Sequence, residues 1–170
     1  MEQNLYGEFR ILPLTTRHKL NSFDSSNIDL NDFLKNDALN YQKYMISKTN
    51  LCFFGNELVG YITLTIDTIG TKKVKVNDEF ESKYSYPSIK IARLAADSRF
   101  ERRGIGTHLL YAAIGKALSI SDSVGCRFGF YCKKSGFFTK PVKNIANGIF
   151  ICHKQVNNDT KSHRYSLKRQ

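Results

Sequence analysis

Apolar residues recur at two different spacings near the start of the chain. The segment Glu8–Leu14 is rich in apolar residues and predicts an opening strand. The residues Ser26–Asp29 read SNID, which fits a helix capping box, and the following apolar residues recur at helical spacing over 28–43. These apolar positions are Leu30, Phe33, Leu34, Ala38 and Tyr41. The sequence therefore predicts a strand and then a helix.

The next elements are predicted to build a sheet. Two β-rich runs, near 50–54 and 58–67, flank the turn dipeptide Gly55-Asn56, which predicts an antiparallel hairpin. A polar stretch follows, in which 76–84 reads as a short helix, and Ile89–Ala96 then reads as a central strand.

Ile105–Ile120 carries a broad apolar stripe at helical spacing, so it is predicted to be a helix. The run 125–132 is β-like, and Ile145–Cys152 and Arg164–Lys168 are expected to be the last two strands. Neither a repeat nor a linker interrupts the order. The prediction is one mixed α/β (α+β) domain over 1–170, with a mostly antiparallel central sheet and flanking helices.

Composition narrows the class of protein. The chain has 170 residues, 41% of them hydrophobic and 24% charged, which is typical of a folded globular domain. No apolar run is long enough to cross a bilayer, and the first residues lack the pattern of a signal peptide. The four cysteines are far apart, so we expect no disulfide framework, no metal site and a reducing cytoplasmic location.

Positive charge is concentrated toward the end of the chain. The net charge is +11, and residues 123–170 hold ten basic side chains against one acidic side chain. Such a segment attracts phosphates, so a nucleic acid or a phosphorylated cofactor is an expected partner. A merely solvated basic surface is the alternative.

A second concentration of basic residues stands where a strand becomes a helix. The run RLAADSRFERRGIGTHLL at 93–110 passes from a buried strand through Arg102 and Arg103 to Gly104 and Gly106. A helix N-terminus offers free N–H groups and partial positive charge. Glycines let a phosphate approach the backbone closely, and they adopt backbone conformations that a side chain would forbid. This arrangement predicts a pyrophosphate site, and it matches neither the Walker loop nor the dinucleotide fingerprint.

The same run resembles the cofactor-binding motif of the GNAT acyltransferase superfamily, whose pattern is Gln/Arg-x-x-Gly-x-Gly/Ala. Three further stretches, FDSSNIDLNDFLKNDAL, NELVGYITL and GFYCKKSGF, resemble one branch, the acetyltransferase toxins of toxin–antitoxin pairs. The resemblance covers roughly 9–138. It implies a GNAT-like fold, acetyl-CoA as co-substrate and, for the toxin branch, a small antitoxin protein as partner. The oligomeric state stays open.

The resemblance also implies roles for individual residues. The thioester carbonyl and the pantetheine arm of acetyl-CoA would bind the strand residues Leu94, Ala95 and Ala96. Tyr131 aligns with the tyrosine that protonates the departing thiolate. The pyrophosphate would bind the backbone amides of Arg102, Arg103, Gly104, Ile105, Gly106 and Thr107.

The sequence departs from the family pattern in two places. Glu101 stands where the family has Gln or Arg, which puts a like charge near the pyrophosphate. A segment that family members carry between positions equivalent to Phe128 and Gly129 is missing, and 126–132 alternates as one continuous strand would. Tyr131 would then face away from Phe130, and an ordinary structural tyrosine is the alternative to the catalytic role.

The implied reaction is direct transfer of an acetyl group to an amine. An α-amino group, with a pKa of about 7.7–8.0, is partly neutral near pH 7, whereas lysine, at about 10.4, needs a base. Candidate bases are Glu57, Asp67 and His18, although an ordinary surface role is favoured for each of them. The basic residues of 123–170 favour aminoacyl-tRNA as acceptor. A protein or small-molecule amine, and a degenerate domain without catalysis, remain the alternatives.

Overall fold

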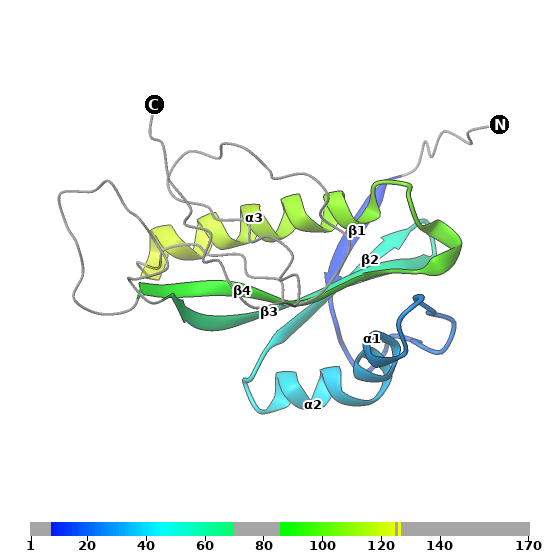
Figure 1. Ribbon diagram of the computed structural model, residues 1–170, viewed down its shortest axis with the longest axis horizontal. Coiled ribbons are helices and arrows are strands. Elements are labelled where there is room, and N and C mark those ends of the chain that lie inside the picture. Colours follow the sequence, from blue (N-terminus) through cyan, green and yellow to red (C-terminus); the bar gives the residue numbers. More distant parts are fainter. Residues whose placement is uncertain (1–7, 70–85, 125, 127–170) are drawn as a thin grey trace, which may run out of the picture. The chain divides into compact units, whose positions relative to one another are not determined.

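The computed structural model of the chain describes residues 8–69, 86–124 and 126. Its strands follow one another in the sheet in the order β1-β2-β3-β4 (Figure 1). The elements, in chain order, are β1 (Phe9–Pro13), α1 (Ile28–Asp32), the π-helical turn η1 (Phe33–Asp37), α2 (Ala38–Lys43), β2 (Lys48–Phe54), β3 (Glu57–Ile69), β4 (Tyr86–Ala96), the 3₁₀ turn η3 (Ser98–Phe100) and α3 (Ile105–Val124).

The predicted elements are confirmed within these ranges. β1 pairs antiparallel with β2, and β2 pairs antiparallel with β3 around the turn at Gly55 and Asn56. The helical segment over 28–43 is present, although it is divided by η1. The α+β class with an antiparallel sheet and flanking helices is confirmed. The elements predicted at 76–84, 145–152 and 164–168 lie outside the described residues. Of the strand predicted at 125–132 only Cys126 is described, and it is not part of a strand.

The described residues separate into two compact units. The first holds 8–64 and Arg93–Ile114, and the second holds 65–69, 86–92, 115–124 and 126. In the second unit, Lys90 Nζ forms an ion pair with Asp67 Oδ2 at 2.9 Å, which joins β3 to β4. The single domain predicted over 1–170 stays a prediction.

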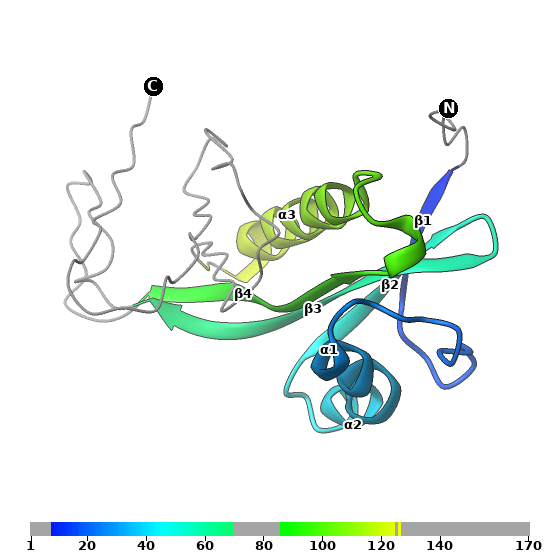
Figure 2. The same ribbon diagram turned by 45° about the vertical axis from the view of Figure 1, so that its right-hand side comes forward.

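In the first unit, α1 and α2 cover one face of the sheet and the first half of α3 covers the other (Figures 1 and 2). Neighbouring residues of β3 point to these two faces, as the pleat of a strand requires. Tyr61 is fully buried under α1, where its ring packs against Phe23 and Phe33 and its hydroxyl donates to the Leu30 carbonyl oxygen at 2.8 Å.

Gly60 lets α3 lie close to the sheet. A Cβ atom there would stand 2.9 Å from the Ala95 carbonyl oxygen, 2.9 Å from Ile105 Cγ2 and 3.0 Å from Leu109 Cδ1. The preceding residue, Val59, is the extra residue of a β-bulge opposite Cys52 and Phe53. The bulge and the glycine together shape the part of β3 that lies beside the end of β4.

Candidate cofactor site

The turn between β4 and α3 has a backbone conformation that few residues tolerate. Arg102 has φ +60° and Gly104 has φ +79°, both in the left-handed region. A non-glycine residue in that region carries a conformational cost, and such costs cluster at functional sites. The prediction that a glycine is needed for its conformation is confirmed at Gly104. It is wrong for Gly106, which lies within α3 and has no positive φ.

The first turn of α3 presents backbone donors that the helix itself does not use. The His108 N–H donates to the Gly104 carbonyl oxygen at 2.9 Å, so Gly104 is the last residue before the helix. The N–H groups of Ile105, Gly106 and Thr107 therefore have no acceptor within the helix. Together with the helix dipole they form a site that fits the pyrophosphate of acetyl-CoA.

β4 is the second element of the candidate site. Its residues Leu94, Ala95 and Ala96 are buried, with exposed fractions of 3%, 1% and 3%, so their side chains are committed to the core. Among the described strands β4 is an edge strand, because only β3 pairs with it. The backbone groups along its other edge fit an extended ligand such as the pantetheine arm.

A buried carboxylate fixes the end of β4. Asp97 is fully buried and accepts hydrogen bonds from the Arg99 amide at 3.0 Å and from Arg99 Nε at 2.9 Å. It also accepts from the Asp24 amide at 3.1 Å, and its own amide donates to the Val59 carbonyl oxygen at 2.9 Å. Asp97 thus joins three segments at the start of the proposed phosphate turn.

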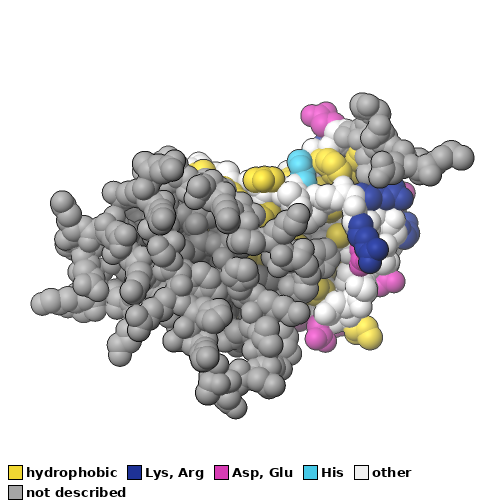
Figure 3. Space-filling view, turned by 45° about the horizontal axis from the view of Figure 1, so that its top comes forward, with side chains coloured by type: hydrophobic (Ala, Val, Ile, Leu, Met, Phe, Trp, Pro, Cys, Tyr) yellow, Lys and Arg dark blue, Asp and Glu magenta, His cyan; other side chains and the backbone are white. Residues whose placement is uncertain are grey.

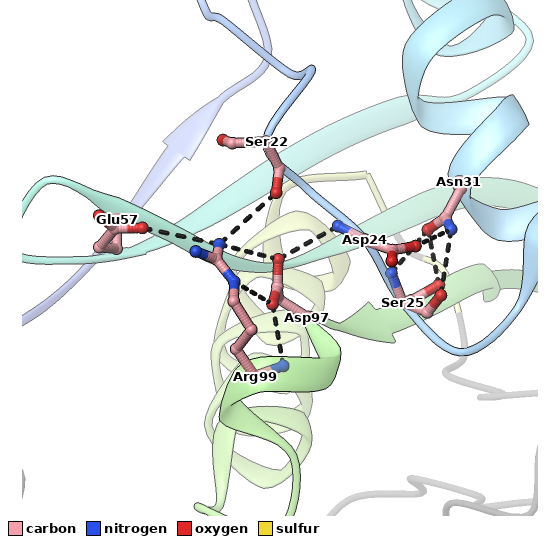
Figure 4. A network of polar contacts seen from close by, with 7 residues as sticks. All are labelled: Ser22, Asp24, Ser25, Asn31, Glu57, Asp97 and Arg99. Atoms are coloured by element: carbon pink, nitrogen blue, oxygen red, sulfur yellow. Dashed lines mark hydrogen bonds and ion pairs between the residues drawn. The ribbon is translucent and has the colours of Figure 1, made fainter.

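The network continues on both sides of Asp97 (Figure 4). Arg99 reaches the Glu57 carboxylate at 3.6 Å and the Ser22 carbonyl oxygen at 3.5 Å, and the Ser98 amide donates to the Asp24 carbonyl oxygen at 2.8 Å. Because Arg99 is engaged in this way, its role is to anchor the turn. The residues that Figure 4 draws are Ser22, Asp24, Ser25, Asn31, Glu57, Asp97 and Arg99.

We expect Asp97→Asn to lower the free energy of unfolding by about 1–3 kcal/mol and to weaken acetyl-CoA binding. An amide in place of the carboxylate offers one acceptor oxygen and sets a buried N–H group against other donors. Urea unfolding and calorimetric titration with acetyl-CoA measure the two effects. Asp32→Asn is the matched control, because Asp32 is exposed and a change there should stay within about 0.5 kcal/mol.

The stability difference between wild type and Asp97→Asn should depend on pH in a defined direction. Burial raises the pKa of the Asp97 carboxyl, but the Arg99 side chain and the Asp24 and Arg99 amides outweigh it, and the pKa lies below the ordinary 3.8. The stabilisation is therefore complete above pH 3.8 and is lost as the pH falls through the lower folded value. A stability gap between wild type and Asp97→Asn that closed already near pH 6 would contradict this assignment.

Glu101, the residue that departs from the family pattern, has a partner in the fold. Its Oε1 atom accepts a hydrogen bond from the Ser26 hydroxyl at 3.2 Å, so the carboxylate is held toward the segment before α1. Arg102 and Arg103 are exposed, and the Arg103 guanidinium carbon lies 5.6 Å from the centre of the Phe100 ring. Figure 3 shows Lys and Arg side chains beside Asp and Glu side chains on the described part of one face.

The three candidate bases all have structural partners. Glu57 faces Arg99, Asp67 forms the ion pair with Lys90, and His18 Nδ1 accepts from the Thr15 amide at 3.0 Å. These contacts favour structural roles, and the general base stays unassigned. Tyr131 and the basic residues of 127–170 lie outside the described residues. Burial raises the pKa of the Cys52 thiol to about 11, so it is a poor nucleophile.

Comparison with known proteins places this site in a family. The sequence profile of the Acetyltransferase (GNAT) family matches residues 15–132, which is most of the chain. The chain belongs to the GNAT family. The match includes β4, the turn and the start of α3, so the glycine-containing turn of this GNAT protein lies inside the family region.

Individual relatives are toxins. A tRNA-acetylating toxin of Mycobacterium tuberculosis is 29% identical over 106 residues, which are 62% of this chain and 64% of that toxin, a little under two thirds of its length. The structure of AtaT complexed with acetyl-methionyl-tRNAfMet has a TM-score of 0.65 and 22% identity, over 71% of this chain and 75% of the other. A mutant AtaT toxin bound to the C-terminus of the antitoxin AtaR and acetyl-CoA has a TM-score of 0.57 and 24% identity, over 71% of each chain.

Membrane spans and metal clusters are both absent from the described part of the chain. No helix in 8–69 or 86–124 is long and apolar enough to span a bilayer. Across those same ranges, no group of three or more His, Cys, Asp or Glu side chains is arranged to hold a metal ion.

The Asp97 network is the part of the site that sequence reasoning missed. Asp97 directly follows a buried strand and precedes Ser98 and Arg99, a position at which an aspartate often caps a turn. That local signal was available. Its partner Asp24 lies 73 residues earlier, and no local pattern could show that contact.

Proposed function

We propose that the chain is an acetyl-CoA-dependent N-acetyltransferase that acetylates the α-amino group of aminoacyl-tRNA and acts as a toxin. The observation that carries this proposal is the junction from β4 to α3, where an edge strand leads through a left-handed glycine to a helix with free amides. Membership of the GNAT family supports the use of acetyl-CoA.

Different residues of the chain would bind the cofactor, orient the thioester and donate a proton. Acetyl-CoA supplies the acetyl thioester. The amides at the start of α3 hold the phosphates, and the backbone of Leu94–Ala96 orients the thioester and stabilises negative charge on its carbonyl oxygen. A neutral amine attacks, the new C–N bond forms as the C–S bond breaks, and the Tyr131 hydroxyl gives its proton to the sulfur. The nitrogen loses its extra proton to solvent, and solvent returns a proton to the tyrosine.

Two observations favour a charged tRNA as acceptor. Residues 123–170 carry ten basic side chains and one acidic side chain, more than a single cofactor requires. The Mycobacterium tuberculosis relative is a tRNA-acetylating toxin, and the AtaT structure contains acetyl-methionyl-tRNAfMet. An α-amino acceptor also needs a general base least, and the three candidate bases have structural partners.

An antitoxin is the proposed protein partner. AtaT was solved with the C-terminus of the antitoxin AtaR, and this chain shares its fold. A protein or small-molecule amine is the alternative acceptor. A domain that binds acetyl-CoA without turnover is the alternative to an enzyme, and the missing segment before Tyr131 favours it.

Reversing two basic charges in the C-terminal third should reduce tRNA acetylation and spare acetyl-CoA binding. The variant is Lys133→Glu with Lys134→Glu. Each lost phosphate contact lowers the affinity for tRNA, most strongly at low salt, and makes tRNA binding less dependent on salt. Labelled acetyl-CoA and charged tRNA, at low and raised salt, measure transfer. The control is Arg17→Glu with Lys19→Glu, an equal charge change at two residues outside this segment.

The same assay separates the alternatives. Label on a peptide amine with none on tRNA at either salt concentration would select the protein-acetyltransferase function. Acetyl-CoA binding without label on any amine would select the non-catalytic domain.

A further inference from the structure

Arg93 of β4 lies in an aromatic environment beside the proposed thioester strand. Its guanidinium carbon is 3.5 Å from the centre of the Phe33 ring and 5.7 Å from the centre of the Tyr41 ring. The residue is half-buried, and Phe33 is the first residue of the π-helical turn η1. Such turns are rare in proteins overall, and many of those that occur lie at functional sites. Both rings interact with the guanidinium through cation–π contacts, which hold it in place.

The N–H donors of Arg93 are not used within the described part of the chain. No described group there accepts a hydrogen bond from its guanidinium or forms an ion pair with it, whereas Arg99 has the Asp97 and Glu57 carboxylates. The nearby Tyr61 hydroxyl donates to the Leu30 carbonyl oxygen. Contact with an aromatic face satisfies none of the five guanidinium donors, so they are available to an external acceptor.

The face of the sheet on which Arg93 lies favours the acceptor substrate, and not acetyl-CoA, as the ligand of those donors. Residues 93 and 95 of a strand face the same side, and Ala95 belongs to the core cluster that contains Phe33 and Tyr61. Arg93 therefore points toward the α1–α2 side, opposite the side that α3 covers. Phosphates of acetyl-CoA bound at the start of α3 would be on that other side. An anion at Arg93 would still lie within about 10 Å of Leu94–Ala96 along the strand.

We propose that Arg93 binds the phosphodiester group that precedes the aminoacylated terminal nucleotide of the acceptor. The inference rests on the proposed acetylation of aminoacyl-tRNA. The planar guanidinium presents paired donors that match two phosphate oxygens, and stacking on Phe33 fixes its plane. Arg93 thus distinguishes an amine carried by a polynucleotide from a free amino acid or a peptide terminus.

Two acceptors that differ only in this phosphate test the proposal. One is 3′-amino-3′-deoxyadenosine that carries an amide-linked amino acid, and the other is the same nucleoside extended by one 5′-linked nucleotide. The amino acid is the one best acetylated on intact tRNA. For wild type we expect a KM about tenfold to a hundredfold lower for the dinucleotide, the range for charge-assisted hydrogen bonds.

Arg93→Met, which replaces the guanidinium with an unbranched apolar side chain, should lose this preference, and the KM for the dinucleotide should rise to that for the nucleoside. Arg93→Lys keeps the charge without the paired donors and should retain only part of the preference. Arg17→Met, at an exposed arginine, is the matched control and should keep all of it. Acetyl-CoA titration confirms that each variant is folded.

Each outcome has a separate meaning. A folded Arg93→Met that keeps the full preference, or a wild type that acetylates both acceptors with equal KM, overturns the role of Arg93 and leaves the proposed function standing. If Arg93→Met does not fold, Arg93→Lys decides, because full preference in that variant overturns the paired-donor contact. Failure of wild type to acetylate charged tRNA overturns the proposed function, and the role of Arg93 with it.

Discussion

The Gly104→Val variant should lose measurable binding of acetyl-CoA while the protein stays folded. Gly104 has φ +79°, which a β-branched residue adopts at a cost of about 1–3 kcal/mol. Either the backbone shifts and the amides of α3 no longer converge, or the valine occupies the space in front of them. No atom of the described residues lies within 4 Å of the place a Cβ would take, so a clash with the described core does not arise. Calorimetry should show an affinity at least about 100-fold weaker, because several charge-assisted hydrogen bonds are lost.

Gly55→Val supplies the matched control for this experiment. Gly55 has φ +58° and, within the part of the chain that the structure describes, also has no atom within 4 Å of an added Cβ, but it lies in the hairpin turn between β2 and β3. It should lose similar stability and bind acetyl-CoA normally. Unchanged acetyl-CoA affinity in a folded Gly104→Val protein would remove the phosphate site from the start of α3.

Tyr131→Phe should lower turnover about 10²–10⁴-fold with little change in acetyl-CoA affinity. The substitution keeps the ring and removes only the hydroxyl that would protonate the leaving thiolate, and general acid catalysis typically contributes this factor. Steady-state kinetics with charged tRNA measures turnover, and calorimetry measures affinity.

Tyr44→Phe is the control, because Tyr44 is 68% exposed in the turn after α2. Full activity in Tyr131→Phe would mean that the missing segment has moved this tyrosine out of its family role. Another proton donor would then have to be identified.

Local sequence patterns predicted the helices and strands well where one strong turn or helix pattern was present. Gly55-Asn56 between two β-rich runs predicted the hairpin, because few residues other than glycine favour the positive φ that this turn needs. The helix at 105 was predicted to end at Ile120 and continues to Val124. Its last turn is rich in residues of low helix propensity, and the Ser123 hydroxyl donates to the Ile120 carbonyl oxygen at 2.9 Å.

Contacts between distant segments decided what local patterns could not. The capping box predicted a cap by Ser26, but the cap is Asn27, whose side chain accepts from the Leu30 amide. The Ser26 hydroxyl instead donates to Glu101, 75 residues later. The same limit hid the Asp97–Asp24 contact and the stacking of Arg93 on Phe33. The proposed phosphate turn could be predicted from the sequence, because its glycine and the helix that follows are adjacent in the chain.

Gly60 has a consequence for the size of the cofactor that the proposed site accepts. Acetyl-CoA is one covalent molecule whose pantetheine arm has a limited reach, and its thioester and pyrophosphate would be held by β4 and by α3. The separation between these elements depends on Gly60, where an added Cβ would press on the Ala95 carbonyl oxygen and on Ile105 at 2.9 Å. Any side chain there would act as a spacer between the two attachment points. Gly60, which would touch neither end of the cofactor, would therefore help to set the distance that the pantetheine arm has to span in the proposed site.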